Sequence, residues 1–142
     1  AGETLSMFNL PPGVPVKYSD LLREKSYGEL EGMAWKSVAK WKAYHLDPYR
    51  KAAGGESTME VAKRLLPLFR KIKERPEKRV LVVTPHNPLC ILVCDFMGMH
   101  YKEWRRFKLS LCGLTEFQHE EGLWRMSRLN DTAHLAGINA KG

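Results

Sequence analysis

The segment from Arg79 to Thr84 constrains the fold of this chain more than any other feature. Its sequence is Arg-Val-Leu-Val-Val-Thr, an almost uninterrupted apolar run that is rich in β-branched residues. Such a run is typical of a strand that is buried on both faces, as in a parallel sheet. Helical patterns lie on both sides of it, so the sequence predicts an α/β layer fold.

The length and composition of the chain set further bounds. A chain of 142 residues favours one domain, which we place over residues 1–142. With 44% hydrophobic and 27% charged residues, the composition excludes a disordered or fibrous chain. No apolar run is as long as a membrane span, and no secretory signal opens the chain, so we expect no membrane partner. The net charge of +7 favours anionic partners.

The patterns predict several further elements around the central strand. Ser57 and Glu60 have the spacing of a capping box, so a long helix begins there, with Pro67 expected to kink or divide it and Pro76 to end it. The remaining expectations are a helix end at 1–9, an edge strand at Val14–Tyr18, loops at 19–32 and 45–56, helices at Met33–Tyr44, Leu89–Met97 and Tyr101–Phe107, and a hairpin of Leu114–Glu120 with Leu123–Leu129.

The three cysteines, Cys90, Cys94 and Cys112, favour buried thiols in a reducing compartment, which predicts a cytoplasmic protein. Cys90 and Cys94 share a helix face and could in principle bind a metal. No second Cys/His pair completes such a site, so packing in the core is the favoured interpretation.

His86 is the first candidate for chemistry. It follows the carboxyl end of the predicted central strand, which is where open α/β sheets bind ligands. The helix that begins near Pro88 would direct its free amides to the same place, so the two features together predict a site for an anion such as phosphate. A histidine that merely caps the helix is the structural alternative.

Glu24 is the second candidate. It lies beside Arg23 in a loop punctuated by glycines, and a carboxyl group beside an anion pocket can protonate a leaving group. Composition alone does not rank Glu24 above Glu29 and Glu31. No pair of histidines has the spacing of a zinc helix, and no serine or cysteine stands in a nucleophile-elbow motif.

Four segments in sequence order resemble the histidine phosphatase superfamily, which is also called phosphoglycerate mutase-like. Residues 22–32 (Leu-Arg-Glu-Lys-Ser-Tyr-Gly-Glu-Leu-Glu-Gly) are similar to its acid loop, and Gly55-Glu56-Ser57 to the start of its long helix. Residues 80–86 resemble its second catalytic strand, and residues 129–135 its C-terminal Asn-x-x-Ala-His-Leu motif. The resemblance implies a three-layer α/β/α fold.

The resemblance also implies roles for particular residues. His86 corresponds to the second histidine, which contacts the transferred phosphoryl group, and Glu24 to the acid that protonates the leaving oxygen. The amide of Asn87 corresponds to a backbone donor to the phosphoryl group. The family works through a phosphohistidine intermediate on phosphorylated small molecules and needs neither a metal nor a cofactor.

Two departures from the family pattern matter. Pro85-His86-Asn87 stands where Ser-His-Gly is usual, and the Arg-His-Gly motif of the nucleophilic histidine is absent from these residues. The resemblance therefore implies that the chain begins inside the family fold and is incomplete at its N-terminus. We expect a separate N-terminal segment, or self-association, to cover the exposed strand edges.

Three alternatives remain beside a phosphatase. A binding pseudo-enzyme would keep the anion pocket without the nucleophile. A phosphoglycerate mutase is disfavoured because the stretch between Gly32 and Ser57 is short, without the basic insertion of the mutases. A nucleic-acid binder, suggested by the basic stretches Lys63–Arg75 and Lys102–Lys108, is disfavoured because exposed aromatic residues do not interleave with the charges.

Overall fold

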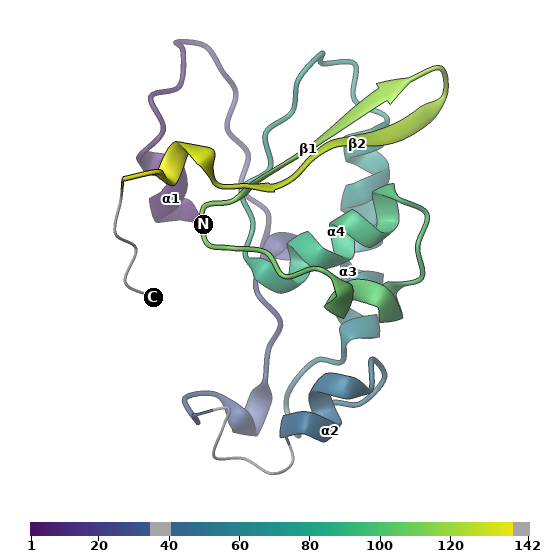
Figure 1. The fold of residues 1–142 in the computed structure, drawn as a ribbon. Helices are drawn as coiled ribbons and strands as arrows, with labels where there is room; N and C mark the ends of the chain where they lie inside the picture. The colour runs from purple at the N-terminus through teal and green to yellow at the C-terminus, as the bar shows by residue number, and fades with distance from the viewer. Residues whose placement is uncertain (35–40, 138–142) are drawn as a thin grey trace.

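The computed structural model describes residues 1–34 and 41–137 (Figure 1). Its helices are α1 (Gly2–Ser6), α2 (Trp41–Leu46), α3 (Thr58–Lys73) and α4 (His86–Phe96), and its strands are β1 (Leu114–Glu120) and β2 (Leu123–Asp131). Short 3₁₀ turns are η1 (Asp20–Leu22), η2 (Gly28–Leu30), η4 (Tyr101–Arg106) and η5 (Ala133–Leu135). This mixture of helices and strands agrees with the predicted α/β class.

Helix α3 begins with the predicted capping box. The Ser57 hydroxyl accepts from the Glu60 amide at 3.1 Å, and the Glu60 carboxylate accepts from the Ser57 amide at 2.8 Å. Contrary to one expectation, Pro67 does not divide the helix, which runs unbroken for 16 residues to Lys73. Leu65 and Phe69 are buried on either side of Pro67, so both halves of the helix are held against the core.

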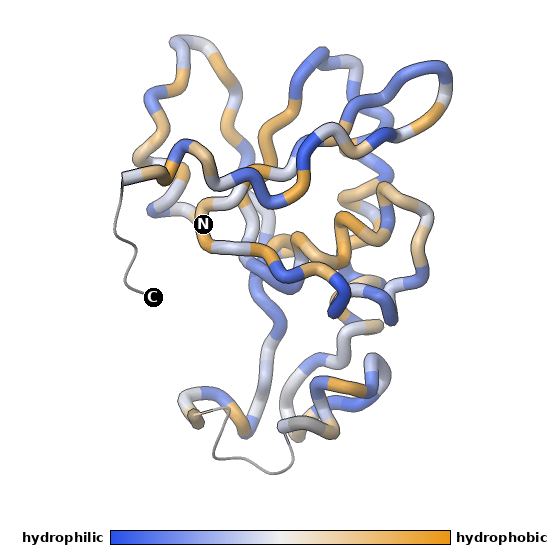
Figure 2. Tube along the Cα trace, viewed as in Figure 1, coloured by the Kyte–Doolittle hydropathy of each residue, from blue (hydrophilic) through white to orange (hydrophobic). Residues whose placement is uncertain are grey.

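Helix α4 is the centre of the core, and hydrophobic residues gather along it (Figure 2). Cys90, Ile91, Val93 and Cys94 are at most 1% exposed, and the helix packs against α3 and η4. The helix begins at His86, earlier than the predicted Leu89. Pro88 was expected to mark the start, but it occupies the first turn, where a missing N–H breaks no intrahelical hydrogen bond.

The predicted hairpin is confirmed. Strands β1 and β2 pair antiparallel, and the connecting residues Glu121 and Gly122 have φ angles of 52° and 78°, as a tight type I′ turn requires. Phe117 and Trp124 lie on one face of the hairpin and pack against Phe96, with distances between ring centroids of 4.9 and 4.6 Å respectively. The hairpin is thereby attached to the end of α4.

The predicted central strand is wrong for this structure. Residues 79–84 form no strand, and the β1–β2 hairpin is the sheet that the described residues form. Val80 and Leu81 are 43% and 54% exposed. The physical reason is that a strand needs a hydrogen-bonded neighbour, and no described segment lies in register beside this one. The predicted edge strand Val14–Tyr18 fails for the same reason.

Smaller expectations had mixed outcomes. The helix end at 1–9 is confirmed as α1, whereas the helix expected at Tyr101–Phe107 is the 3₁₀ turn η4. The helix expected at Met33–Tyr44 falls largely on residues 35–40, outside the described residues. Its described end, α2, extends through His45, which was expected in a loop. No described helix is both long and apolar enough to span a membrane.

The accessible surface of the chain is large for its mass. It measures 10,397 Å², whereas a compact monomer of 16.3 kDa should expose about 7,500 Å². Part of the excess is apolar, because several large side chains face solvent: Val14, Val16, Tyr18, Val80, Leu81 and Leu129. The surface is therefore suited to being covered by another segment or another chain.

Candidate active site

The three residues predicted for the site lie together in the structure. His86 is the first residue of α4 and is exposed, while Asn87 beside it is buried. The two oxygens of the Glu24 carboxylate accept from the backbone amide of Asn87 at 3.3 and 3.4 Å, although the residues are 63 positions apart. Since a helix N-terminus favours negative charge, α4 holds an anion, here the Glu24 carboxylate, beside His86.

A network of ion pairs and hydrogen bonds around the mostly buried Glu56 carboxylate holds the loop that carries Glu24 against α3. We call residues 22–32 the acid loop. The Glu56 carboxylate accepts from the Arg23 guanidinium at 3.0 Å, from the Arg64 Nε at 2.9 Å and from the Ser26 amide at 3.1 Å. Arg64 also donates to the carbonyls of Leu21 and Arg23. These contacts fix where the acid loop places Glu24.

Two further side chains of the acid loop, Lys25 and Tyr27, lie close enough to Glu24 to interact with it electrostatically. Lys25 is only 6% exposed, and its Nζ lies 3.4 Å from the Thr58 hydroxyl. Burial lowers the pKa of Lys25, and the nearby Glu56 and Glu24 carboxylates oppose that effect. The Tyr27 hydroxyl accepts from the Asn87 side-chain amide at 3.0 Å. Burial raises the pKa of Tyr27, so a neutral hydroxyl holds Asn87 in place.

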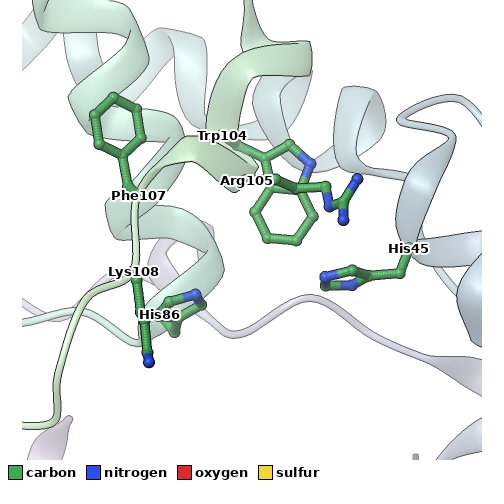
Figure 3. Close-up of a pocket in the computed structure, with 6 residues that line it drawn as sticks. All are labelled: His45, His86, Trp104, Arg105, Phe107 and Lys108. Atoms are coloured by element: carbon green, nitrogen blue, oxygen red, sulfur yellow. The ribbon is translucent and has the colours of Figure 1, made fainter.

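A pocket of about 290 Å³ opens beside His86 (Figure 3). The residues that line it are His45, His86, Trp104, Arg105, Phe107 and Lys108. The His45 ring lies edge-on to Trp104, with centroids 5.0 Å apart. Burial lowers the pKa of His45, and the positive charges of Arg105, Lys25 and His86 lower it further. The described pocket lining thus includes two basic side chains, Arg105 and Lys108, and no acidic one.

Cys90 contacts the ring of His86 from inside the core. Its Sγ lies 3.6 Å from the His86 Nε2 and 3.8 Å from the Phe107 carbonyl oxygen. Burial raises the pKa of Cys90 to about 12 and that of Cys94 to about 11. Both are therefore protonated core thiols at neutral pH, as expected, whereas Cys112 is exposed and departs from that expectation. Within residues 1–34 and 41–137, no group of histidine, cysteine and acidic side chains is placed to hold a metal.

Sequence reasoning missed most of the pocket wall. His45, Trp104, Arg105 and Lys108 carry no motif, and they reach His86 from α2 and from the region around η4. The one available signal was the basic stretch Lys102–Lys108, which sequence reasoning weighed only as a nucleic-acid surface. Of the other histidines, His100 caps η4, where its Nδ1 accepts from the Lys102 amide at 3.1 Å, and His119 is exposed on β1.

Comparison with known proteins assigns the family. The model of the histidine phosphatase superfamily (branch 1) matches residues 1–132. The chain belongs to this superfamily. It is 31% identical over 149 residues to the probable phosphatase C1687.21 of Schizosaccharomyces pombe, an alignment that covers 94% of this chain and 67% of that protein. It is 25% identical over 139 residues to the uncharacterized phosphatase PhoE of Bacillus subtilis, covering 97% and 69%.

Solved structures share the fold of this superfamily member. The mycobacterial glucosyl-3-phosphoglycerate phosphatase Rv2419c with inorganic phosphate superposes with a TM-score of 0.70 at 20% identity, over 85% of this chain and 67% of that one. The α-ribazole phosphatase of Shigella flexneri gives 0.70 at 17% identity, over 84% and 62%. The predicted phosphoglycerate mutase-like α/β fold is thus confirmed, and the superfamily is one of hydrolases.

Proposed function

We propose that this chain forms part of a phosphatase that hydrolyses phosphorylated small molecules through a phosphohistidine intermediate. In this proposal His86 is the second catalytic histidine, Glu24 is the general acid, and the Asn87 amide binds the phosphoryl group. The observation that carries the proposal is the placement of the Glu24 carboxylate within 3.4 Å of the Asn87 amide, at the helix N-terminus that begins with His86.

The proposed reaction has two displacements. A nucleophilic histidine attacks phosphorus and the bond to the leaving oxygen breaks, while Glu24 gives that oxygen its proton. Water then attacks the phosphohistidine, and Glu24 accepts a proton from that water. The Asn87 backbone amide and the His86 imidazole would stabilise the charge on the phosphoryl oxygens by hydrogen bonding. For this, Glu24 must leave the Asn87 amide when a phosphoryl group takes its place.

The nucleophilic histidine belongs to the proposal as well. No Arg-His-Gly sequence occurs in the 142 residues, so we propose that a preceding segment supplies it and pairs with residues 79–84. The exposed Val80 and Leu81 and the large accessible surface support this, because a covering strand would bury them. The chain covers about two thirds of the length of both curated relatives.

The test measures hydrolysis by the intact protein, including any residues encoded before Ala1. His86→Ala should lower kcat for p-nitrophenyl phosphate by at least about 100-fold, since it removes a group that acts only on the transferring phosphoryl. Glu24→Gln should slow alkyl phosphates more than p-nitrophenyl phosphate, because nitrophenolate leaves without a proton. His119→Ala, at an exposed position of β1 where the histidine ring contacts Trp124 rather than the site, is the matched control and should leave kcat unchanged.

Each result has a defined meaning. Unchanged kcat in His86→Ala would overturn the assignment of His86. An intact protein that binds phosphate but shows no turnover and no acid-labile phosphoprotein would favour the alternative of a binding pseudo-enzyme. Transfer of the phosphoryl group to a second substrate, rather than to water, would favour phosphoglycerate mutase-type chemistry.

A further inference from the structure

The pocket beside His86 carries positive charge that the proposed displacement does not use. Arg105, Lys108 and His45 line it together with His86, and none of the six described lining residues is acidic. In Figure 3 the Arg105 guanidinium lies on the His45 side of the Trp104 ring, and Lys108 lies toward His86. The phosphoryl site at the start of α4 is thus continued by a second basic region.

The cations of this pocket are available to a ligand. Arg105 and Lys108 are exposed and form no ion pair with any described residue. By contrast, the neighbouring Arg106 is paired with Glu103. A guanidinium with free donors is suited to bind a carboxylate or a phosphate through two hydrogen bonds.

The pocket is held by the core rather than by a free loop. Trp104 is 3% exposed and belongs to the core cluster with Ile91 and Phe96, so the backbone that carries Arg105 is fixed. The volume of about 290 Å³ lies at the lower end of the range for small-molecule sites. This size fits a compact metabolite better than a polymer.

We propose that this pocket binds a second anionic group of the substrate, and that Arg105 and Lys108 are its ligands. This rests on the proposed function and sharpens it: the preferred substrates are small phosphate monoesters that also carry a carboxylate or another phosphate. Trp104 also lines the pocket and would lie between the two anionic groups, and His86 would contact the transferred phosphoryl.

The test uses non-hydrolysable probes, so it does not depend on turnover. Phosphonoacetate carries a carboxylate next to its phosphonate, and ethylphosphonate has the same two-carbon chain without the carboxylate; 2-methylpropylphosphonate, which matches the branched shape without the charge, controls for size. Titration calorimetry, or the NMR shift of the Trp104 indole N–H, should show that phosphonoacetate binds about tenfold more tightly than ethylphosphonate at low salt. The double variant Arg105→Ala/Lys108→Ala should reduce this preference to about onefold.

Controls separate local binding from general charge. The double variant Lys102→Ala/Arg106→Ala also removes two positive charges, from η4 outside the pocket lining, and should keep the preference. Ethane-1,2-diyl bisphosphonate compared with phosphonoacetate shows whether the second group is a phosphate or a carboxylate. Equal affinity for phosphonoacetate and ethylphosphonate, or a preference that survives the double variant, would overturn the inference. A preference without phosphatase turnover would overturn only the proposed function.

Discussion

Gly28 is a residue at which the acid loop and the loop before α3 approach each other closely. Its φ is +55°, and a Cβ built there would lie 2.1 Å from the Ala53 carbonyl oxygen. Neither backbone can yield easily, because the Glu29 amide donates to that same carbonyl at 3.0 Å and the Glu56 amide donates to the Ser26 carbonyl at 2.8 Å. Glycine is therefore required at this position for steric reasons as well as for its φ angle.

We predict that Gly28→Ala lowers the free energy of unfolding by at least about 3 kcal/mol and displaces Glu24 from α4. The matched control is Gly32→Ala. Gly32 also has a positive φ, of +76°, but has open space around it. Gly32→Ala should therefore lower the free energy of unfolding by only about 1 kcal/mol. Urea denaturation measures both variants, and similar losses for the two would contradict the steric argument.

His45 gives a second prediction at the scale of a residue. Burial, followed by the charges of Arg105, Lys25 and His86, lowers the pKa of His45 from 6.5. Arg105→Ala should therefore raise the pKa of His45, as measured by an NMR titration of its Hε1 proton. Lys102→Ala is the charge control and should raise it less.

The lowered pKa of His45 also has a consequence for stability. Below pH 6.5 the unfolded chain binds a proton at His45 that the folded chain resists, so this contribution to stability is present above pH 6.5 and is lost as the pH falls. His45→Gln should flatten that part of the stability profile. An equally steep profile in the variant would contradict the role of His45.

Among the elements, the connection of the acid loop to α3 depends most on Glu56. Its carboxylate is 15% exposed and joins Arg23, Ser26 and Arg64, of which Arg64 is 13% exposed. Removing a buried ion-pair partner leaves the other charge unsatisfied. The geometry of Glu24 therefore depends on a residue that does not touch the proposed substrate.

We predict that Glu56→Ala lowers the free energy of unfolding by about 2–4 kcal/mol. This loss is smaller than for a fully buried ion pair because the Arg23 side chain is half exposed. Glu56→Ala should also raise hydrogen exchange across the acid loop. Glu77→Ala, which breaks the Arg75–Glu77 pair at the surface, is the control and should leave stability unchanged. Equal effects for the two variants would show that the network at Glu56 does not hold the loop.

For the molecule as a whole, the exposed apolar side chains predict association. Val80 and Leu81 lie in an extended segment without a strand partner, which other chains can pair with. We predict that the 142-residue chain by itself sediments as dimers or larger species at micromolar concentration. Leu81→Asp should shift it toward the monomer, whereas Leu123→Asp, at the hairpin turn, should not. A compact monomer that unfolds cooperatively would contradict this prediction.

The sequence by itself determined the features that depend on short-range patterns. The capping box at Ser57 and Glu60, the turn at Glu121-Gly122 and the apolar helix α4 all follow from residues within a few positions of one another. The acid loop, His86 and the family resemblance were likewise readable, because motifs preserve residue type and order. That Glu24 lies beside Asn87 was implied by the resemblance alone.

Tertiary structure decided what depends on distant partners. Arg79–Thr84 has every local property of a buried strand, yet it forms none, because backbone pairing needs a neighbour that no described segment supplies. The pocket wall is a second case: His45, Arg105 and Lys108 meet His86 only because Trp104 packs in the core and brings η4 against α4. Local sequence does not predict that these side chains line one pocket, because the packing energy that brings them together comes from the whole core rather than from any one segment.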